Sequence, residues 1–345
     1  MLVPEFLSKL MARDAKLSSL TSEHEIIQQG LGPLLALSTQ SLTLQKNNLL
    51  EQLKLQNWQQ KSKVLFAEFS KQQINFLVFK GFAFTHLLYN HSHIRPYSDI
   101  DIIIDESDYK IVFDILTQQG YRQHPSRQGR LVSFQNSFFD NSSPNTVIDL
   151  HWQINNRIEF HKYFPFSELY ESAIELDSKQ FIFKSLDFVN AFILGCFHYQ
   201  AHRPNDKKHI WLYDLALLWQ KMDSSLQKSC LEKAKTSNQS NIVLNSLSLL
   251  QTTFTDCFDF DFDLSHRQDE ATGYYLQLRT NKISDIKTRI QNIDGIRNKA
   301  KFIAEYVFQS REYVRNRYQL KSNKWVLFNY PRMWTEDVLK LFKHT

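Results

Sequence analysis

The chain has 345 residues, of which 42% are hydrophobic and 22% charged, so its composition is that of a folded protein and excludes global disorder. Its 41 Lys and Arg residues exceed its 36 Asp and Glu residues by five, which permits an anionic ligand but does not argue for nucleic acid. The three cysteines lie far apart without CxxC spacing, so we expect buried or free thiols in a reducing cytoplasm.

The sequence carries no signal for a membrane or for secretion. No stretch reaches the roughly 18 to 20 uncharged apolar residues that a membrane-spanning helix needs. The first 20 residues lack the continuous apolar core of a secretory signal. We therefore expect a cytoplasmic protein without a membrane partner.

Helices are predicted at the N-terminal end of the chain. From about Ser22 to Gln73 apolar residues recur at spacings of three and four, interrupted early by Gly30, Gly32 and Pro33, which indicates two or three helices. We assign residues 1–71 to an N-terminal helical region that leads into a first strand at about 75–79.

The segment 76–109 predicts a strand, a tight turn, a helix, a loop and a second strand. Gly81 stands where the chain must reverse from the first strand into the helix. In the second strand, about 98–104, Asp99 and Asp101 stand at positions i and i+2 and therefore share a face. Two carboxylates held together repel each other, so we expect a cation between them.

Two more strands are expected, at about 130–138 and 146–152, where the second carries Asp149 and His151 on one face. This brings a third carboxylate to a neighbouring strand, and residues 72–155 are predicted to form the sheet core. After Pro165 the pattern becomes helical and stays so, which predicts a C-terminal helical domain over residues 156–345. The acidic and aromatic segment 254–265 is predicted to be a loop or a short edge strand.

His198 and His202 stand at i and i+4 and would share a helix face, as a zinc pair does, but the sequence offers no identifiable third ligand. We expect His198 and Asp214 to hold two helices together or to line a cleft for an acceptor. His151 is expected to support the carboxylates from behind or to line the same cleft.

Three clustered carboxylates suit a hard divalent cation, because Mg²⁺ prefers oxygen ligands and takes only a few carboxylates. Nucleotidyl transfer uses two such ions about 3.5 to 4 Å apart to align the attacking and leaving oxygens. Lys80 and Gly81 would let a helix N-terminus approach a triphosphate, with the Lys80 ammonium as a point charge. Arg95 could reach a phosphate or pair with the aspartates.

The ordered set Phe-Lys-Gly at 79–81, Arg-Pro-Tyr-Ser-Asp-Ile-Asp-Ile at 95–102 and Ile-Asp-Leu-His-Trp at 148–152 resembles poorly characterised bacterial nucleotidyltransferases of the DNA polymerase β-like superfamily. Segments 194–198 and 211–216 are similar to a His-containing helix and a Leu-x-x-Asp-Leu helix of that family, so the resemblance covers about residues 22–260. It departs from the wider superfamily at 80–81, where a Gly-Ser turn is usual.

The resemblance implies an α+β (mixed α/β) fold, in which a small polymerase β-like sheet core is flanked by N-terminal helices and a large helical C-terminal region. It also implies that Asp99 and Asp101 bind both metal ions, Mg²⁺ or Mn²⁺. Asp149 would complete the metal site on the nucleophile side and help to deprotonate the acceptor.

We therefore expect a metal-dependent enzyme that transfers NMP from an NTP such as ATP to a hydroxyl or phosphate acceptor, in a small molecule or a protein side chain, with release of pyrophosphate. Two alternatives stay open: a non-catalytic nucleotide-binding or interaction module that keeps the fold, and a nucleotidyltransferase that modifies tRNA ends. Long nucleic acid is not expected as a partner, because no dense basic stripe is present.

Overall fold

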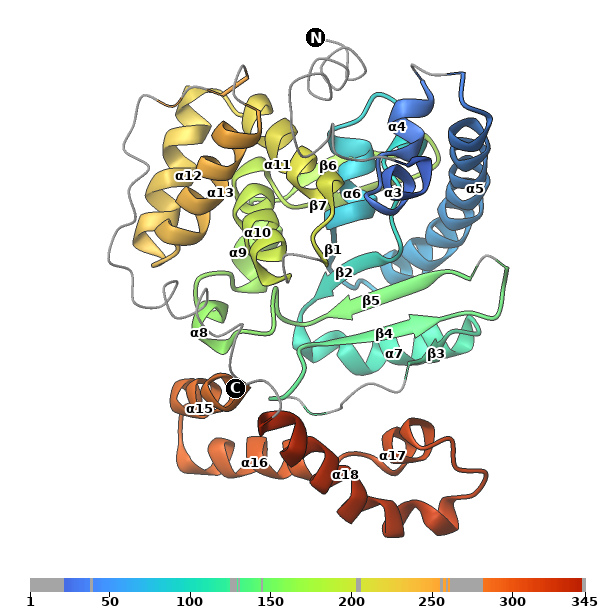
Figure 1. Ribbon diagram of the computed structural model, residues 1–345, viewed down its shortest axis with the longest axis vertical. Helices are drawn as coiled ribbons and strands as arrows, with labels where there is room; N and C mark the ends of the chain where they lie inside the picture. The colour runs from blue at the N-terminus through green and yellow to red at the C-terminus, as the bar shows by residue number, and fades with distance from the viewer. Residues whose placement is uncertain are drawn as a thin grey trace.

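The computed structural model describes residues 22–37, 40–124, 129, 131–143, 145–202, 206–254, 257–258, 260 and 282–342. A mixed sheet lies at the centre, helices pack against both of its faces, and a layer of C-terminal helices lies beside it (Figure 1). The acidic and aromatic segment 254–265 falls mostly outside the described residues, so its predicted structure stays a prediction.

The described residues place seven strands in one sheet, in the order β3-β4-β5-β2-β1-β7-β6. The pairs β1–β7 and β2–β5 are parallel and the other neighbours are antiparallel, which confirms the predicted mixed α/β class. The strands are β1 Phe76–Phe79, β2 Ile100–Ile104, β3 Arg122–Gln123, β4 Gln135–Phe139, β5 Val147–His151, β6 Ile174–Asp177 and β7 Ile182–Ser185.

Several helices begin at a polar residue whose side chain accepts a hydrogen bond from a backbone N–H of the first turn. Ser41, Asp187 and Asp223 do so at the starts of α5, α10 and α12. The helices are α3 Glu23–Gln28, α4 Gly32–Ala36, α5 Leu42–Lys71, α6 Lys80–Leu87, α7 Tyr109–Gln118, α8 Ile158–His161, α9 Phe166–Glu171, α10 Phe188–Ala201, α11 His209–Lys221, α12 Ser224–Thr236, α13 Ser240–Thr253, α15 Lys282–Asn292, α16 Ile296–Val307, α17 Arg311–Arg317 and α18 Val326–Phe342, with 3₁₀ turns η1 Ser92–Ile94, η2 Glu106–Asp108 and η4 Asn323–Trp325.

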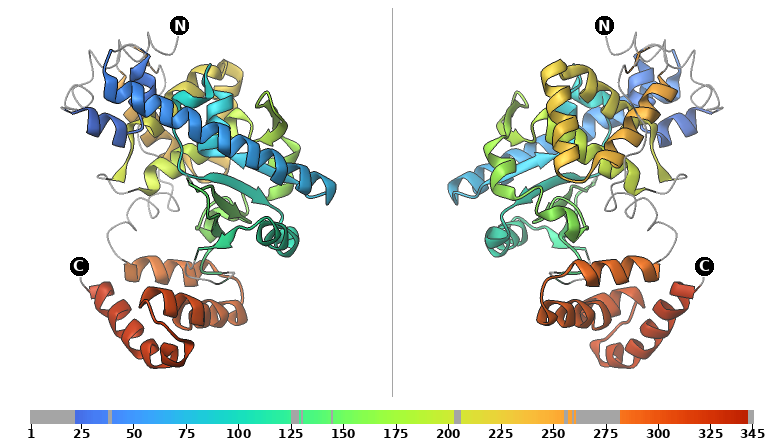
Figure 2. Two further views of the ribbon diagram at one scale, coloured as in Figure 1. Left: turned by 90° about the vertical axis from the view of Figure 1, so that its right-hand side faces the viewer. Right: turned by 90° about the vertical axis from the view of Figure 1, so that its left-hand side faces the viewer.

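One face of the sheet is covered by α5 and α7, and α5 crosses it over much of its length (Figure 2). Phe66 and Phe69 of α5 pack there with Val78 of β1 and Ile102 of β2. Burial of each such side chain contributes about 1.5 to 3 kcal/mol to the free energy of folding. This face of the sheet is therefore wholly apolar along its central strands.

The opposite face of the sheet turns toward α10 and α11. Leu77 and Phe79 of β1 and Ile103 of β2 pack into the cluster formed by these helices with α12 and α13. Because successive side chains of a strand point to opposite faces, Asp101 lies on the same side as Ile103. The polar side chains of the central strands thus face α10 and α11.

The prediction that the chain stays helical after Pro165 was wrong. Strands β6 and β7 form a hairpin at 174–185, and β7 joins the sheet beside β1 through the pair Val78 and Ser185. These strands have only four residues each, too few to produce a clear alternation in the sequence. The sheet therefore extends beyond residue 155.

The C-terminal helices α15 to α18 lie below the sheet in Figures 1 and 2. Val132 packs with Ile293, which follows α15, and with Phe302 of α16, and Ile290 of α15 packs against the same cluster. The C-terminal helices therefore contact the segment that precedes β4. In the part of the chain that the structure describes, no helix is both long enough and apolar enough to cross a membrane.

Candidate functional site

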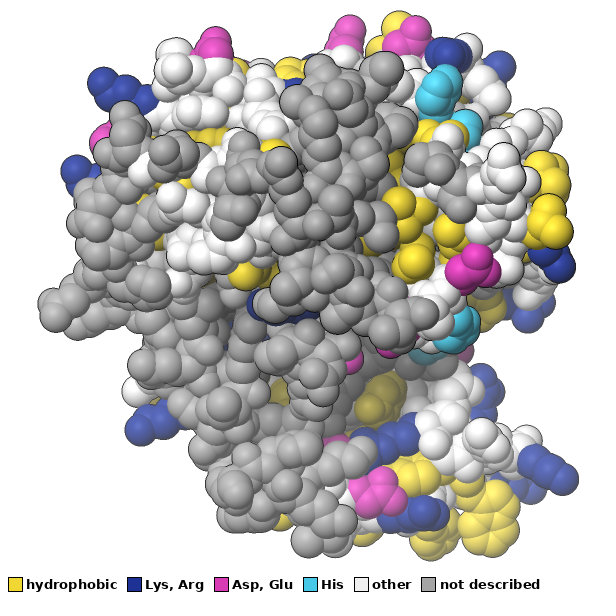
Figure 3. Space-filling model, turned by 45° about the horizontal axis from the view of Figure 1, so that its top comes forward, with side chains coloured by type: hydrophobic (Ala, Val, Ile, Leu, Met, Phe, Trp, Pro, Cys, Tyr) yellow, Lys and Arg dark blue, Asp and Glu magenta, His cyan; other side chains and the backbone are white. Residues whose placement is uncertain are grey.

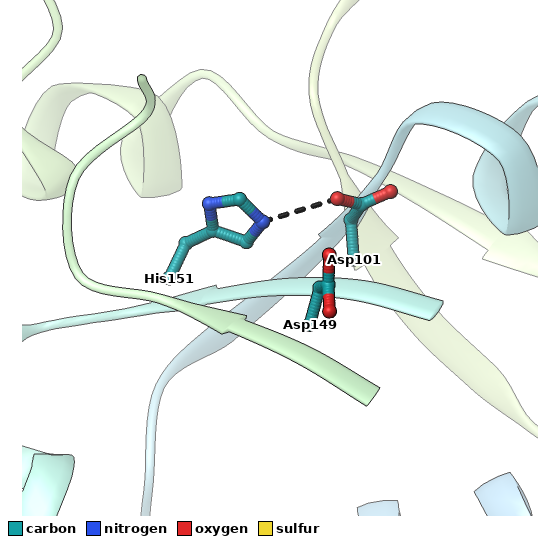
Figure 4. A group of neighbouring side chains, drawn as sticks. All are labelled: Asp101, Asp149 and His151. Carbon is teal, nitrogen blue, oxygen red and sulfur yellow. Dashed lines mark hydrogen bonds and ion pairs between the residues drawn. The ribbon is translucent and has the colours of Figure 1, made fainter. Parts of the chain in front are cut away.

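Two aspartates become direct neighbours through the parallel pairing of β2 and β5. The register places Asp101 opposite Asp149, and Ile103 opposite His151. One ligand atom from each of Asp101, Asp149 and His151 lies within 4.8 Å of the others, and the three side chains converge in Figure 4. Their carboxylate oxygens and imidazole nitrogen form a group that could hold a metal ion.

Asp99 precedes β2 and lies outside that three-residue group, although the sequence predicted it as a ligand. Burial, with the charges of Asp101 and Asp149, raises the pKa of Asp99 to about 7. The three carboxylates therefore still influence one another. A further positive charge beside them would reduce the repulsion between these carboxylates.

His151 is buried beside Asp101. It is 2% exposed, its ring packs edge-on against Phe79 with centroids 5.0 Å apart, and its Nε2 lies 3.0 Å from Oδ1 of Asp101. Burial, followed by the charge of Lys80, lowers the pKa of His151, so the ring is neutral near pH 7. We assign the proton to Nε2, which donates to Asp101. Among the described residues, Nδ1 has no hydrogen-bond partner.

Lys80 supplies the positive charge that the structure brings to the carboxylates. Its Nζ lies 2.6 Å from Oδ1 of Asp101. Burial opposes the charge of Lys80, but Asp101 outweighs it and leaves the pKa of Lys80 raised. The same ion pair lowers the pKa of Asp101 despite its burial.

The turn from β1 into α6 is built differently from the sequence prediction. Lys80 has the left-handed conformation, with φ of +56°, and Gly81 does not. A Cβ atom at Gly81 would lie 2.7 Å from Nη1 of Arg95 and 2.9 Å from Cβ of Tyr97. The absence of a side chain at Gly81 therefore allows Arg95 and Tyr97 to pack closely against the backbone. The positive φ of Lys80 is what turns the chain from β1 into α6.

Arg95 is directed toward α11. Its Nη2 lies 2.5 Å and its Nε 3.2 Å from Oδ2 of Asp214, and the Tyr89 hydroxyl donates to Oδ1 of Asp214 at 2.6 Å. Burial works against the charge of Arg95, but Asp214 keeps the pKa of Arg95 raised. The structure thus pairs Arg95 with Asp214 rather than with Asp99 or Asp101.

These groups line a cleft of about 760 Å³ between the sheet and helices α10 and α11. Lys80, Gly81, Asp99, Asp101 and Asp149 line it, and so do Arg95, His151, His198 and Asp214, so the predicted site residues share one cavity. The volume lies within the range of sites for small molecules and cofactors.

Sequence reasoning missed several residues of this cleft. Gln135 faces His151 across β4 and β5, and its amide donates to Asp149 at 3.4 Å. Asn156 and Arg157 line the cleft after β5, and Trp211 lines it from α11. Only the period-two pattern of β4 could have suggested Gln135, because the other positions depend on how distant segments pack.

A family model described as an uncharacterised nucleotidyltransferase matches residues 11–255. A search of curated proteins found no match. Among solved structures, the chain is similar to an antigenic nucleotidyltransferase-like protein from Paracoccidioides brasiliensis, at 13% sequence identity and a TM-score of 0.33, over 56% of this chain and 89% of that one.

Proposed function

Because this chain belongs to the uncharacterised nucleotidyltransferase family, we propose that it transfers NMP from an NTP to a hydroxyl or phosphate acceptor and releases pyrophosphate. The observation that carries this proposal is the register that makes Asp101 and Asp149 direct partners, with Asp99 just before β2 in the same cleft. An NTP is therefore the expected substrate, and the acceptor is a small molecule or a protein side chain.

The residues present fit a divalent cation such as Mg²⁺ or Mn²⁺. Asp101 and Asp149 supply convergent carboxylate oxygens, and the raised pKa of Asp99 indicates that Lys80 alone does not neutralise the carboxylates. Asp99, Asp101 and Asp149 would hold the metal. A bound divalent ion at such a site lowers the pKa of an attacking hydroxyl and stabilises negative charge on phosphate oxygens.

The proposed reaction forms a bond between the acceptor oxygen and the α-phosphorus, and breaks the bond from that phosphorus to the oxygen bridging to the β-phosphate. The proton of the acceptor passes to Asp149 or to water. Lys80, 2.6 Å from Asp101, can turn its ammonium group from that carboxylate to a phosphate oxygen. His151 holds Asp101 in position by donating a hydrogen bond from its Nε2.

The substitution Asp101→Asn tests this proposal, because it removes a charge and keeps the size of the side chain. We expect pyrophosphate release from an NTP with Mg²⁺ to fall at least about a hundredfold, as when a transition-state contact is lost. Circular dichroism checks that the fold is kept. Asp114→Asn is the matched control, since Asp114 is exposed on α7, away from the cleft, and pairs with Lys110. Equal turnover in both variants would contradict the proposal.

Calorimetry with each NTP, with and without Mg²⁺, separates this function from its alternatives. Metal-dependent binding followed by pyrophosphate release supports the transferase. Binding that ignores the metal, without release, supports a non-catalytic nucleotide-binding module. Micromolar, salt-sensitive binding of tRNA would favour the alternative of a nucleotidyltransferase that modifies tRNA ends.

A further inference from the structure

Three rings form a compact group in the wall of the cleft. His198 lies on α10, His202 follows the end of that helix, and Trp211 lies on α11. The ring centroids are 4.7 Å apart for His198 and His202, 4.6 Å for His198 and Trp211, and 4.5 Å for His202 and Trp211. We call these three residues the ring group.

The ring group differs from the other aromatic side chains that line the cleft. Among the described lining residues, Phe79, Phe84, Tyr97 and Phe197 are 1 to 8% exposed and belong to the core. His198, His202 and Trp211 are half-buried as whole residues. Within the described part of the cleft, they therefore offer the aromatic surface on which a ligand could stack.

The charge of the ring group suits a planar, neutral ligand. Burial, followed by the charges of Lys80 and His202, holds the pKa of His198 well below its usual value, so His198 is neutral. His198, His202 and Trp211 line the same cleft as Asp99, Asp101 and Asp149. Lys208 holds its Nζ over the Trp211 ring, 5.8 Å from the ring centroid.

We infer that the ring group binds the base of the NTP by stacking, while the carboxylates and Lys80 hold the triphosphate. This inference rests on the proposed function and names the subsite that the base occupies. Stacking on aromatic rings tolerates any base, because each base has a π-face. Purines present the larger face, so ATP and GTP should bind more tightly than CTP and UTP.

The test compares ATP with inorganic tripolyphosphate, which has the same phosphate chain and no base. The dissociation constants are measured by calorimetry in Mg²⁺ for the full chain. We expect the unmodified protein to bind ATP about tenfold more tightly than tripolyphosphate. Trp211→Leu should remove that advantage and leave tripolyphosphate binding unchanged, and Trp211→Phe, which keeps a ring, should retain most of it.

Each outcome decides a different point. If Trp211→Leu weakens both ligands equally, or neither, the rings only pack α10 against α11 and the inference is wrong. If the unmodified protein binds ATP no better than tripolyphosphate, the inference is wrong even when Trp211→Leu does not fold. If neither ligand binds with Mg²⁺, the proposed function itself fails, and the inference fails with it.

Discussion

At the scale of single residues, Lys80 and Asp99 carry most of the electrostatic argument. A residue other than glycine in the left-handed region costs about 1 to 2 kcal/mol, and Lys80 adopts that conformation with φ of +56°. In this conformation its Nζ lies 2.6 Å from Oδ1 of Asp101. Asp99 has no such partner among the contacts described for it and keeps a pKa raised to about 7.

The raised pKa of Asp99 predicts a pH dependence of stability. Since the pKa is near 3.8 in the unfolded chain, Asp99 favours folding fully below about pH 4 and loses that contribution as the pH rises toward 7. The free energy of unfolding, compared with that of Asp99→Asn, should fall by about 1.4 kcal/mol per pH unit in this window and then level off. Urea unfolding curves of the two proteins, recorded without metal at each pH, measure this difference in the free energy of unfolding.

The comparison with Asp99→Asn is needed because other groups titrate in the same range with the opposite sign. Burial lowers the pKa values of His86 and His161 to about 4, so their contribution is lost as the pH falls below about 6.5. Both histidines are present in the unmodified protein and in Asp99→Asn, so their contributions cancel in the difference between the two free energies of unfolding. A difference that stays constant from pH 4 to 7 would contradict the assignment for Asp99.

At the scale of secondary-structure elements, the contact of Arg95 and Tyr89 with Asp214 joins the segment between α6 and β2 to α11. These three side chains are 4%, 6% and 1% exposed. A buried ion pair contributes little net stability, but removal of one partner leaves the other charge buried without compensation. This contact therefore determines where α11, and with it Trp211, lies against the sheet.

Asp214→Asn should lower the free energy of unfolding by about 3 to 5 kcal/mol, because Arg95 then keeps an uncompensated charge in the core. Asp114→Asn, which breaks the exposed pair with Lys110 on α7, should cost less than about 0.5 kcal/mol. Both values follow from urea unfolding curves. Similar losses in the two variants would show that Arg95 and Asp214 are not coupled in this way.

At the scale of the whole molecule, the C-terminal helices add a basic layer beyond the span of the family model. Residues 282–342 hold 13 Lys and Arg against 6 Asp and Glu. Their net charge of +7 (13 − 6) is larger than the +5 of the whole chain. Figure 3 shows Lys and Arg interspersed with hydrophobic side chains on the lower part of the molecule. Arg289 of α15 connects this layer to the cleft, since it donates to the carbonyl oxygens of Val132 and Asn156.

Arg289→Ala should loosen the cleft loop at Asn156 and Arg157 rather than unfold the protein. Loss of two hydrogen bonds from a charged donor makes local opening easier, so amide hydrogen exchange at residues 154–157 should become about tenfold faster. Exchange in β2 should not change. Arg297→Ala, at an exposed position on α16, is the control. Equal exchange in the two variants would contradict this connection.

How much of the site could be predicted differs from residue to residue. Asp101 and Asp149 were predicted correctly as a pair on neighbouring strands, because the period of two in a strand is a local property. The family membership was also predicted from the order of the motifs. Lys80 was expected at a phosphate, and in the structure its Nζ contacts Asp101, a contact that depends on the unusual backbone of one residue.

The sequence by itself determined the order of the motifs and the placement of Asp101 and Asp149 on strands, because side-chain alternation is encoded within a few residues. The tertiary structure alone decided the parallel register of β2 and β5, the entry of His151 into the carboxylate group and the pairing of Arg95 with Asp214. It also brought Trp211 to His198. These contacts join residues far apart in the chain, and their positions follow from how the helices pack on the sheet as a whole.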